Sequence, residues 1–229
     1  MKYPKIQTVY KRVLEPGPDK GKLIEGAWTF PEFEALQDME WEATEKIDGT
    51  NIRISWDAKA QQVGFKGRRE NPIDYASLVT YLASTFTPSL FNDAELTSMT
   101  LYGEGYGKGI QKPGKLYNPN GVSFILFDIL VVSEEGPLWL SSSNIDNIAK
   151  TLKIDVVPYW GTMTIYAAVQ YVKGGFKSAV PVKGHEALAA LPQAEGLVLR
   201  APCGMRNRRG GRIITKIKTK DFVRGYANV

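Results

Sequence analysis

Residues 44–51 read Thr44-Glu45-Lys46-Ile47-Asp48-Gly49-Thr50-Asn51, which places a lysine, a short acid and a glycine close together. Glycine permits a tight turn because it has no Cβ, and such a turn lets a bound nucleotide come against the backbone. A lysine amine beside that turn is a candidate nucleophile toward phosphorus. The stretch therefore predicts that Lys46 carries the chemistry of the chain.

Length and composition predict one globular domain spanning residues 1–229, with 43% hydrophobic and 23% charged residues. No apolar run approaches the ~20 residues of a membrane span, and the N-terminus lacks the apolar core of a signal peptide. A single cysteine, Cys203, excludes an internal disulfide, and with one histidine also excludes a Cys/His metal site. These features predict no membrane partner and a cytoplasmic protein, in the host cytoplasm if the chain is phage-encoded.

Positive charge is concentrated near the C-terminus. The segment 200–224 holds nine cations and one acid, a net charge of +8, whereas the whole chain carries only +5. Such concentration favours a polyanionic partner, the alternative being a solvated basic tail. The interleaved Ile213, Ile214, Ile217 and Phe222 indicate a packed strand with two lysines on one face.

Residue patterns predict an α+β fold with largely antiparallel sheets flanked by helices, because strands and helices mix without strict βαβ alternation. The lysine motif lies in or just before a hairpin whose turn is 57–60. We predict strands at 3–14, 41–56, 62–68, 101–104, 122–132, 195–200 and 212–218, helices at 31–37, 73–86, 141–152, 163–173 and 185–191, and a loop at 105–121.

A lysine nucleophile has special electrostatic needs. Its ordinary pKa is about 10.4, so the free amine is scarce near neutral pH. Burial and nearby cations lower such a pKa, and we expect Lys216, Lys218 and Arg68 to do this at Lys46 while also binding a triphosphate. An acid such as Glu195 could hold a divalent metal or its water shell.

Six segments, in order along the chain, resemble those of covalent nucleotidyltransferases, and specifically of ATP-dependent RNA ligases of the RNA ligase 2 type. They are TEKIDGTNIRI, FKGRR, YGEGYGKGIQ, SFILFDIL, EGLVLR and ITKIKTKDF. The resemblance implies a nucleotidyltransferase (ATP-grasp-like) domain that uses ATP and Mg²⁺ or Mn²⁺. The chain departs from the pattern of most DNA ligases and capping enzymes in one respect: we expect no C-terminal OB domain, because only eleven residues follow Lys218.

The resemblance further implies roles for single residues. Lys46 would attack the α-phosphate of ATP, Glu104 would bind the ribose and Phe127 would stack on adenine. Glu195 would help place the metal, and Asn51 would assist strand joining. The implied catalytic residues are Lys46, Lys216, Lys218 and Arg68, and the implied nucleotide-binding residues are Glu45, Lys46, Ile47, Asn51, Arg68, Glu104, Phe127, Glu195, Lys216 and Lys218.

RNA ends are the implied partner, with DNA or RNA–DNA hybrid ends as alternatives and an accessory protein standing in for the absent domain. Arg68 would contact AMP or the 5′-phosphate, with Arg69 as the alternative register. The expected nucleic-acid contacts are Asn51, Arg69, Lys108, Lys112, Arg206, Arg208 and Arg209.

Three other functions compete with an RNA ligase that joins 5′-phosphate to 3′-hydroxyl ends. They are a minimal ATP-dependent DNA ligase, an mRNA-capping guanylyltransferase and a non-catalytic nucleic-acid-binding module. The sequence of residues 44–51 favours the RNA ligase over the other two enzymes. The intact lysine, acids and phosphate-type lysines argue against a binding module, because binding alone does not require them.

Overall fold

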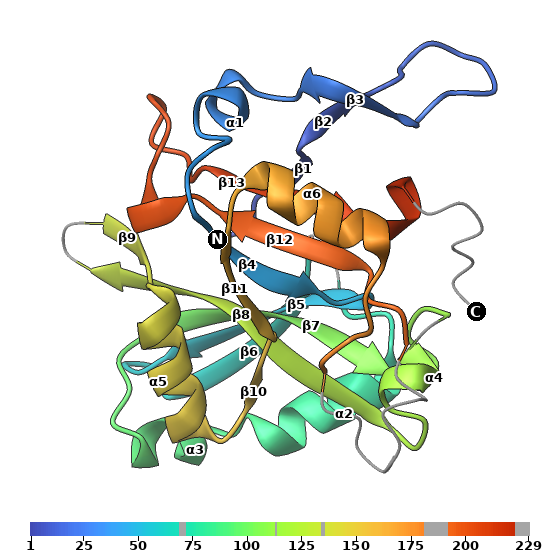
Figure 1. Cartoon of the computed structure of the whole chain (residues 1–229). Coiled ribbons are helices and arrows are strands. Elements are labelled where there is room, and N and C mark those ends of the chain that lie inside the picture. The colour runs from blue at the N-terminus through green and yellow to red at the C-terminus, as the bar shows by residue number, and fades with distance from the viewer. Residues whose placement is uncertain (69–71, 113, 134–135, 181–191, 223–229) are drawn as a thin grey trace.

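The computed structural model describes residues 1–68, 72–112, 114–133, 136–180 and 192–222 and contains two large sheets (Figure 1). The first sheet has five strands. The strand order is β1 (Gln7–Thr8), β13 (Ile214–Lys218), β12 (Gly196–Arg200), β4 (Trp41–Lys46) and β11 (Tyr159–Met163). β1 runs parallel to β13, and the other pairs are antiparallel.

The second large sheet has six strands and is also mainly antiparallel. Its order is β10 (Asp155–Val156), β8 (Val122–Ser133), β7 (Met99–Gly107), β5 (Thr50–Asp57) and β6 (Gln62–Gly67), with β9 (Gly136–Trp139) paired to β8. A separate hairpin of β2 (Tyr10–Arg12) and β3 (Leu23–Trp28) lies beyond the five-stranded sheet (Figure 1). The α+β prediction with largely antiparallel sheets is confirmed.

Each sheet is covered by helices on one face (Figure 1). α6 (Ile165–Gly174) buries Val169 and Val172 against Leu197, Leu199 and Ile217 of the five-stranded sheet. On the six-stranded sheet, side chains of three helices join the apolar core: α2 (Ala76–Thr85), α3 (Pro88–Asp93) and α5 (Ser142–Leu152). The remaining helices are α1 (Pro31–Ala35), α4 (Gly114–Tyr117), η2 (Pro202–Gly204) and η3 (Thr219–Asp221).

The uncovered side of the five-stranded sheet carries most of its polar chemistry. Side chains alternate between the faces of a strand. Because Leu197 and Ile217 face α6, Val198, Lys216 and Lys218 face the other way. A cavity on this side is lined by residues of both large sheets, so the two sheets meet at a shared site.

The lysine motif moves the chain from one sheet to the other. β4 ends at Lys46 and β5 begins at Thr50, so the predicted single strand over 41–56 is wrong: it is two strands in different sheets. A Cβ on Gly49 would lie 2.3 Å from the carbonyl oxygen of Gly105, so only glycine fits this turn. The β5–β6 hairpin that follows the motif is confirmed.

Helices predicted at 31–37, 73–86, 141–152 and 163–173 are confirmed, as are the strands near 62–68, 122–132, 195–200 and 212–218. The segment 3–14 holds the short strands β1 and β2. β3, α3, β9, β10 and β11 were not predicted, and the expected loop at 105–121 contains the end of β7 and all of α4. The helix predicted at 185–191 lies outside the described residues. Among those described, no helix is long and apolar enough to cross a membrane.

A β-bulge in β8 aims two neighbouring side chains to the same side. Tyr102 of β7 pairs with Asp128, but Gly103 pairs with Leu126, so Phe127 is the extra residue. A bulge breaks the alternation of a strand. Leu126 and Ile129 face the covered core, whereas Phe127 and Asp128 both lie on the side of the cavity.

Replacing Gly196 by alanine should destabilise the fold strongly. Gly196 has φ of +148°, and a Cβ there would lie 2.0 Å from the carbonyl oxygen of Ile217. Strain plus displacement of β13 should lower the free energy of unfolding by about 2 kcal/mol or more, measured by urea denaturation. The matched control is Gly174→Ala, because nothing lies within 4 Å of a Cβ there. Equal stability of the two variants would contradict this packing.

Candidate active site

A cavity of about 310 Å³ lies between the two large sheets and is closed on one side by the N-terminal residues Tyr3, Pro4 and Ile6. Its volume is at the lower end of the range for small-molecule sites. Eight residues predicted from the sequence line it: Glu45, Lys46, Ile47, Asn51, Arg68, Glu104, Phe127 and Lys216. Segments far apart in the sequence therefore meet where the lysine motif changes sheets.

The amine of Lys46 is held by a carboxylate that it shares with a second lysine. Lys46 Nζ lies 2.5 Å from Glu195 Oε2, and Lys218 Nζ lies 2.8 Å from Glu195 Oε1. Only 7% of the Glu195 side chain is exposed, against 22% for Lys46 and 20% for Lys218. One buried carboxylate thus bridges two ammonium groups.

The strand register explains this bridge. Gly196, the first residue of β12, pairs with Lys46 of β4 on one side and with Lys218 of β13 on the other. Glu195 directly precedes it, between the two lysines. The carbonyl of Glu195 accepts a hydrogen bond from the amide of Thr219 at 2.8 Å, which fixes its backbone. Because Gly196 has no side chain, the strands approach closely enough for one carboxylate to reach both amines.

The electrostatics of Lys46 differ from the prediction. Burial alone would lower its pKa, but Glu195, Glu104 and Asp48 together raise it above the ordinary value. The expected lowering by neighbouring cations is therefore wrong, because the charges of three acidic side chains at the amine outweigh the effect of burial. Burial would likewise raise the pKa of Glu195, yet Lys46 and Lys218 lower it. Lys46 and Glu195 stabilise each other as a charged pair.

Glu104 of β7 is a carboxyl group poised to titrate near neutral pH. Burial raises its pKa to about 8, and the charges of Glu195 and Asp48 act in the same direction, against the lowering by Lys46. The amide of Gly49 donates a hydrogen bond to it. Asn51 pairs with Glu104 across β5 and β7, and its Oδ1 is buried without a hydrogen-bond partner. Asn51 thus offers an unused polar oxygen beside the Glu104 carboxyl group.

Lys216 marks the cationic end of the cavity. Burial lowers its pKa to about 8, and Lys218, Lys46 and Arg68 act in the same direction. Arg68 is exposed at the mouth, where it follows β6. Such a group of cations is costly by itself and suits an anionic ligand.

Phe127 gives the cavity an aromatic wall. Its ring is partly buried, and Tyr3 packs edge-on against it with centroids 5.0 Å apart and an interplanar angle of 70°. Arg200 donates a hydrogen bond to the carbonyl of Phe127. The ring is therefore fixed at its edge and its backbone while it still lines the cavity.

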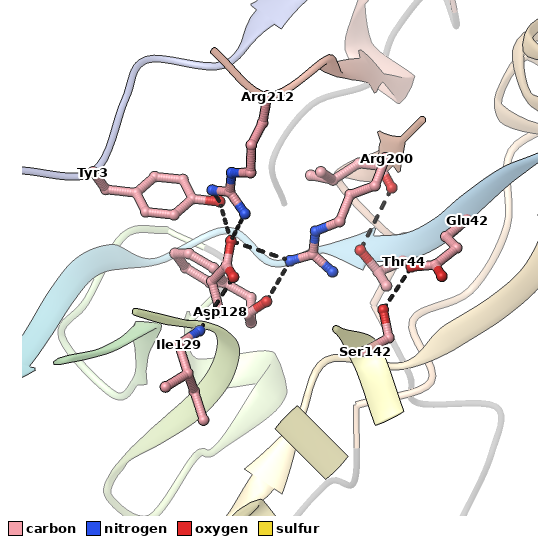
Figure 2. Close-up of polar contacts among 10 residues, drawn as sticks. Tyr3, Glu42, Thr44, Asp128, Ile129, Ser142, Arg200 and Arg212 are labelled. Carbon is pink, nitrogen blue, oxygen red and sulfur yellow. Dashed lines mark hydrogen bonds and ion pairs between the residues drawn. The ribbon is translucent and has the colours of Figure 1, made fainter. Parts of the chain in front are cut away.

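A buried ion network fixes this wall and the N-terminal segment (Figure 2). Asp128, fully buried, accepts hydrogen bonds from Tyr3 at 2.8 Å and from Arg212 at 2.6 Å, and Arg200 lies 3.6 Å away. Arg212 also lies 3.8 Å above the ring of Trp139. The network links the N-terminal segment to β8, to Arg200 at the end of β12 and to Arg212, which lies two residues before β13.

Two predicted nucleotide-binding residues contribute differently from the rest. The Glu45 carboxylate accepts hydrogen bonds from Ser178 and from the amide of Ala179, on the face of β4 opposite Lys46. Burial raises its pKa. Ile47 is 3% exposed, packs with Tyr106 and Tyr117, and its carbonyl lies 3.4 Å from Lys46 Nζ. Glu45 and Ile47 thus line the cavity while their side chains serve mainly to anchor the motif.

Most of the predicted nucleic-acid contacts lie away from the cavity. Only Asn51 lines it. Lys108 and Lys112 are exposed beyond the end of β7, and Arg206, Arg208 and Arg209 belong to the segment before β13. Arg69 lies outside the described residues. The positive charge near the C-terminus is also partly neutralised, because Arg200 and Arg212 bind Asp128 and Lys218 binds Glu195.

Several site residues were missed from the sequence. Tyr3, Arg200 and Arg212 were not singled out, and Asp48 was read only as a polar neighbour of the lysine. Asp128 directly follows Phe127 in the predicted strand, so an acid inside an apolar run was the available signal. The residue pattern does not indicate the bulge that turns the side chains of Phe127 and Asp128 to the side of the cavity.

The donor set fits a hydrated divalent ion rather than an all-protein metal cage. Within the described ranges, no three His, Cys, Asp or Glu side chains gather as a metal-binding group. Both oxygens of Glu195, the predicted ligand, are taken by lysines. Mg²⁺ commonly keeps several waters and binds one or two carboxylates plus substrate phosphates, a mode that Glu195 can serve.

Comparison with known families agrees with the geometry, since the sequence model of the RNA ligase family matches residues 39–218. The chain belongs to the RNA ligase family. The matched range contains the lysine motif, Glu104, Phe127, Glu195 and both lysines of β13. No curated protein matches the chain.

Solved structures of the Naegleria gruberi RNA ligase share the fold. A mutant with ATP and Mn is 19% identical with a TM-score of 0.63, over 99% of this chain and 65% of that chain. A mutant with AMP and Mn is 19% identical with a TM-score of 0.60, over 83% of this chain and 52% of that chain. The chain thus spans about half to two thirds of the length of these relatives.

Asp128→Asn should destabilise the fold far more than removal of a surface charge. Breaking a buried ion pair leaves an uncompensated charge and costs about 3–5 kcal/mol, and Arg200 and Arg212 would both lose their carboxylate. The control is Glu25→Gln, which removes a partner of Lys173 from a half-exposed pair and should cost under about 1 kcal/mol. Urea unfolding measures both. Similar losses would contradict the proposed role of the Asp128 network.

Proposed function

We propose that this RNA ligase is ATP-dependent and joins 5′-phosphate to 3′-hydroxyl ends through AMP carried on Lys46. The observation that supports it most is a lysine amine inside a cavity, beside Lys216 and bridged to Lys218 by Glu195. ATP or AMP with Mn in the solved Naegleria structures supports the choice of nucleotide. The intact amine and its ion pairs favour an enzyme over a binding module.

In the first step, Lys46 Nζ attacks the α-phosphorus of ATP. Because Lys46 starts as an ammonium group, one proton must leave before the attack, and Glu195 Oε2, at 2.5 Å, is at hydrogen-bond distance to accept it. The N–P bond then forms as the bond from that phosphorus to the pyrophosphate oxygen breaks, and the nitrogen releases a second proton to solvent. Lys216 and Lys218 would hold the phosphates, and a triphosphate there would compete with Glu195 for Lys218. Without Lys218 as its partner, Glu195 would accept a proton from Lys46 more readily, so the neutral amine would form where the nucleotide is bound.

The rest of the nucleotide would lie across the same cavity. Phe127 offers a ring for the base, as aromatic side chains do for nucleobases generally. Asn51 Oδ1, buried without a partner, and Glu104 would accept hydrogen bonds from ribose hydroxyl groups. Near pH 7 the raised pKa of Glu104 also lets it donate.

Two further transfers would complete sealing. A 5′-phosphate oxygen attacks the α-phosphorus, the N–P bond breaks, and Lys46 regains its protons. A 3′-hydroxyl then attacks the activated 5′-phosphate, loses its proton, and AMP leaves. Arg68, exposed at the mouth, would contact the 5′-phosphate. Each transfer depends on positioning and charge neutralisation by these cations. A bound Mg²⁺ or Mn²⁺, held through Glu195, would supply additional charge neutralisation at the phosphates.

Incubation with [α-³²P]ATP and Mg²⁺ or Mn²⁺ should leave a covalent label on the denatured protein. Lys46→Arg should abolish the label, because it keeps the positive charge opposite Glu195 but removes the primary amine. The matched control, Lys59→Arg, changes an exposed lysine in the turn between β5 and β6 and should label like the unchanged protein. Denaturing electrophoresis gives the readout.

Other outcomes separate the competing functions. Label from GTP and not from ATP would identify a capping-type guanylyltransferase. Label that persists in Lys46→Arg would exclude Lys46 as the carrier, and absence of any label would favour a binding module. With ATP label present, sealing of nicked DNA without sealing of RNA would move the proposal to a DNA ligase.

A further inference from the structure

A second hollow, of about 580 Å³, opens directly beside the active-site cavity. One wall is the N-terminal segment from Lys5 through β1 and β2, and the other is β13 with the residues after it. β1 and β13 pair in parallel with Thr8 opposite Lys216, so the two walls are joined by a strand ladder. We call this hollow the basic groove.

Among the described residues, those that line the basic groove include six cations and no acid: Lys5, Lys11, Arg12, Lys216, Lys218 and Lys220. Arg12 is neutralised by Asp221, with Nη2 2.6 Å from Oδ2, and Lys218 by Glu195. For the other four lysines, the described part of the chain supplies no ion-pair partner. Crowded, uncompensated cations oppose folding by mutual repulsion, so their presence in a hollow indicates an anionic ligand.

The basic groove is continuous with the site of chemistry. Lys216 and Ile6 line both the groove and the cavity that contains Lys46. Burial lowers the pKa of Lys216 to about 8, and the positive charges of Lys218, Lys46 and Arg68 act in the same direction. An anionic chain lying in the groove would therefore reach the Lys46 cavity along Lys216.

The number and spread of the cations favour a long anion over a short one. Lys216 and Lys218 would contact the phosphates of a nucleotide bound at Lys46. Lys5, Lys11 and Lys220, which also line the groove, would then remain available to further phosphates. A polynucleotide strand carries one charge per nucleotide and extends beyond its reacting end. The groove is also larger than the active-site cavity itself.

We infer that the basic groove binds the sugar–phosphate backbone of the RNA strand next to its reacting end, with Lys5 and Lys11 as phosphate contacts. This inference rests on the proposed function for its choice of RNA. It assigns nucleic-acid binding to the N-terminal segment rather than to the exposed cations before β13. It also gives that segment, fixed at Tyr3 by Asp128, a direct role in substrate binding.

The test is the double variant Lys5→Gln/Lys11→Gln, which removes two exposed charges with little change of volume. Binding of a fluorescent, 5′-phosphorylated single-stranded RNA is measured across a range of salt concentrations. The variant should bind about tenfold more weakly at 0.1 M salt, and the slope of log K against log salt should fall by about 1.4, or 0.7 per lost contact. Labelling of Lys46 by ATP should be unchanged.

The matched control is Lys59→Gln/Lys150→Gln, which removes two exposed lysines outside the groove and should leave affinity and slope unchanged. RNA binding equal to that of the control would overturn the inference. So would lost ATP labelling with unchanged RNA binding, because the groove would then serve the pyrophosphate end of ATP. Groove-dependent RNA binding in a protein that never labels with ATP would support the groove while the proposed function fails.

Discussion

The carboxylate of Glu195, shared between Lys46 and Lys218, is the interaction on which the rest of the site depends. It fixes the position of the amine, and it depends on Gly196, which pairs with both lysines and lets β12 approach β13 closely. Two ammonium groups this close repel each other strongly unless an anion lies between them. The anion between them is Glu195 in the described state, and a phosphate group is the natural substitute when a nucleotide binds.

This arrangement changes the account of how the lysine becomes reactive. With three carboxylates facing it, Lys46 is stored as a cation, and its pKa lies above the ordinary value. In the proposed reaction, activation of Lys46 therefore requires that these charges be redistributed when the nucleotide binds. Burial is the largest cause both of the raised pKa of Glu104, about 8, and of the lowered pKa of Lys216, also about 8, and like charges nearby shift each pKa in the same direction as burial.

Much of the fold class and of the site could be predicted from the sequence, because the chemistry-bearing residues sit in short segments with distinct patterns. Lys46, Glu104, Phe127 and Lys216 meet in one cavity as expected. The sign of the Lys46 pKa shift could not be predicted, since it depends on how many acids cross-strand pairing brings near the amine. The Asp128 network was equally hidden: it requires the bulge at Phe127 and joins residues more than eighty positions apart.

The most direct test of the account is the reactivity of Lys46 toward an amine-acylating reagent as a function of pH, read peptide by peptide by mass spectrometry. The titration should give Lys46 a pKa above the ordinary value of a lysine, and Glu195→Gln should lower it. A Lys46 pKa below the ordinary value in the unchanged protein, or one that Glu195→Gln does not move, would contradict the claim that Glu195 holds the amine as a cation.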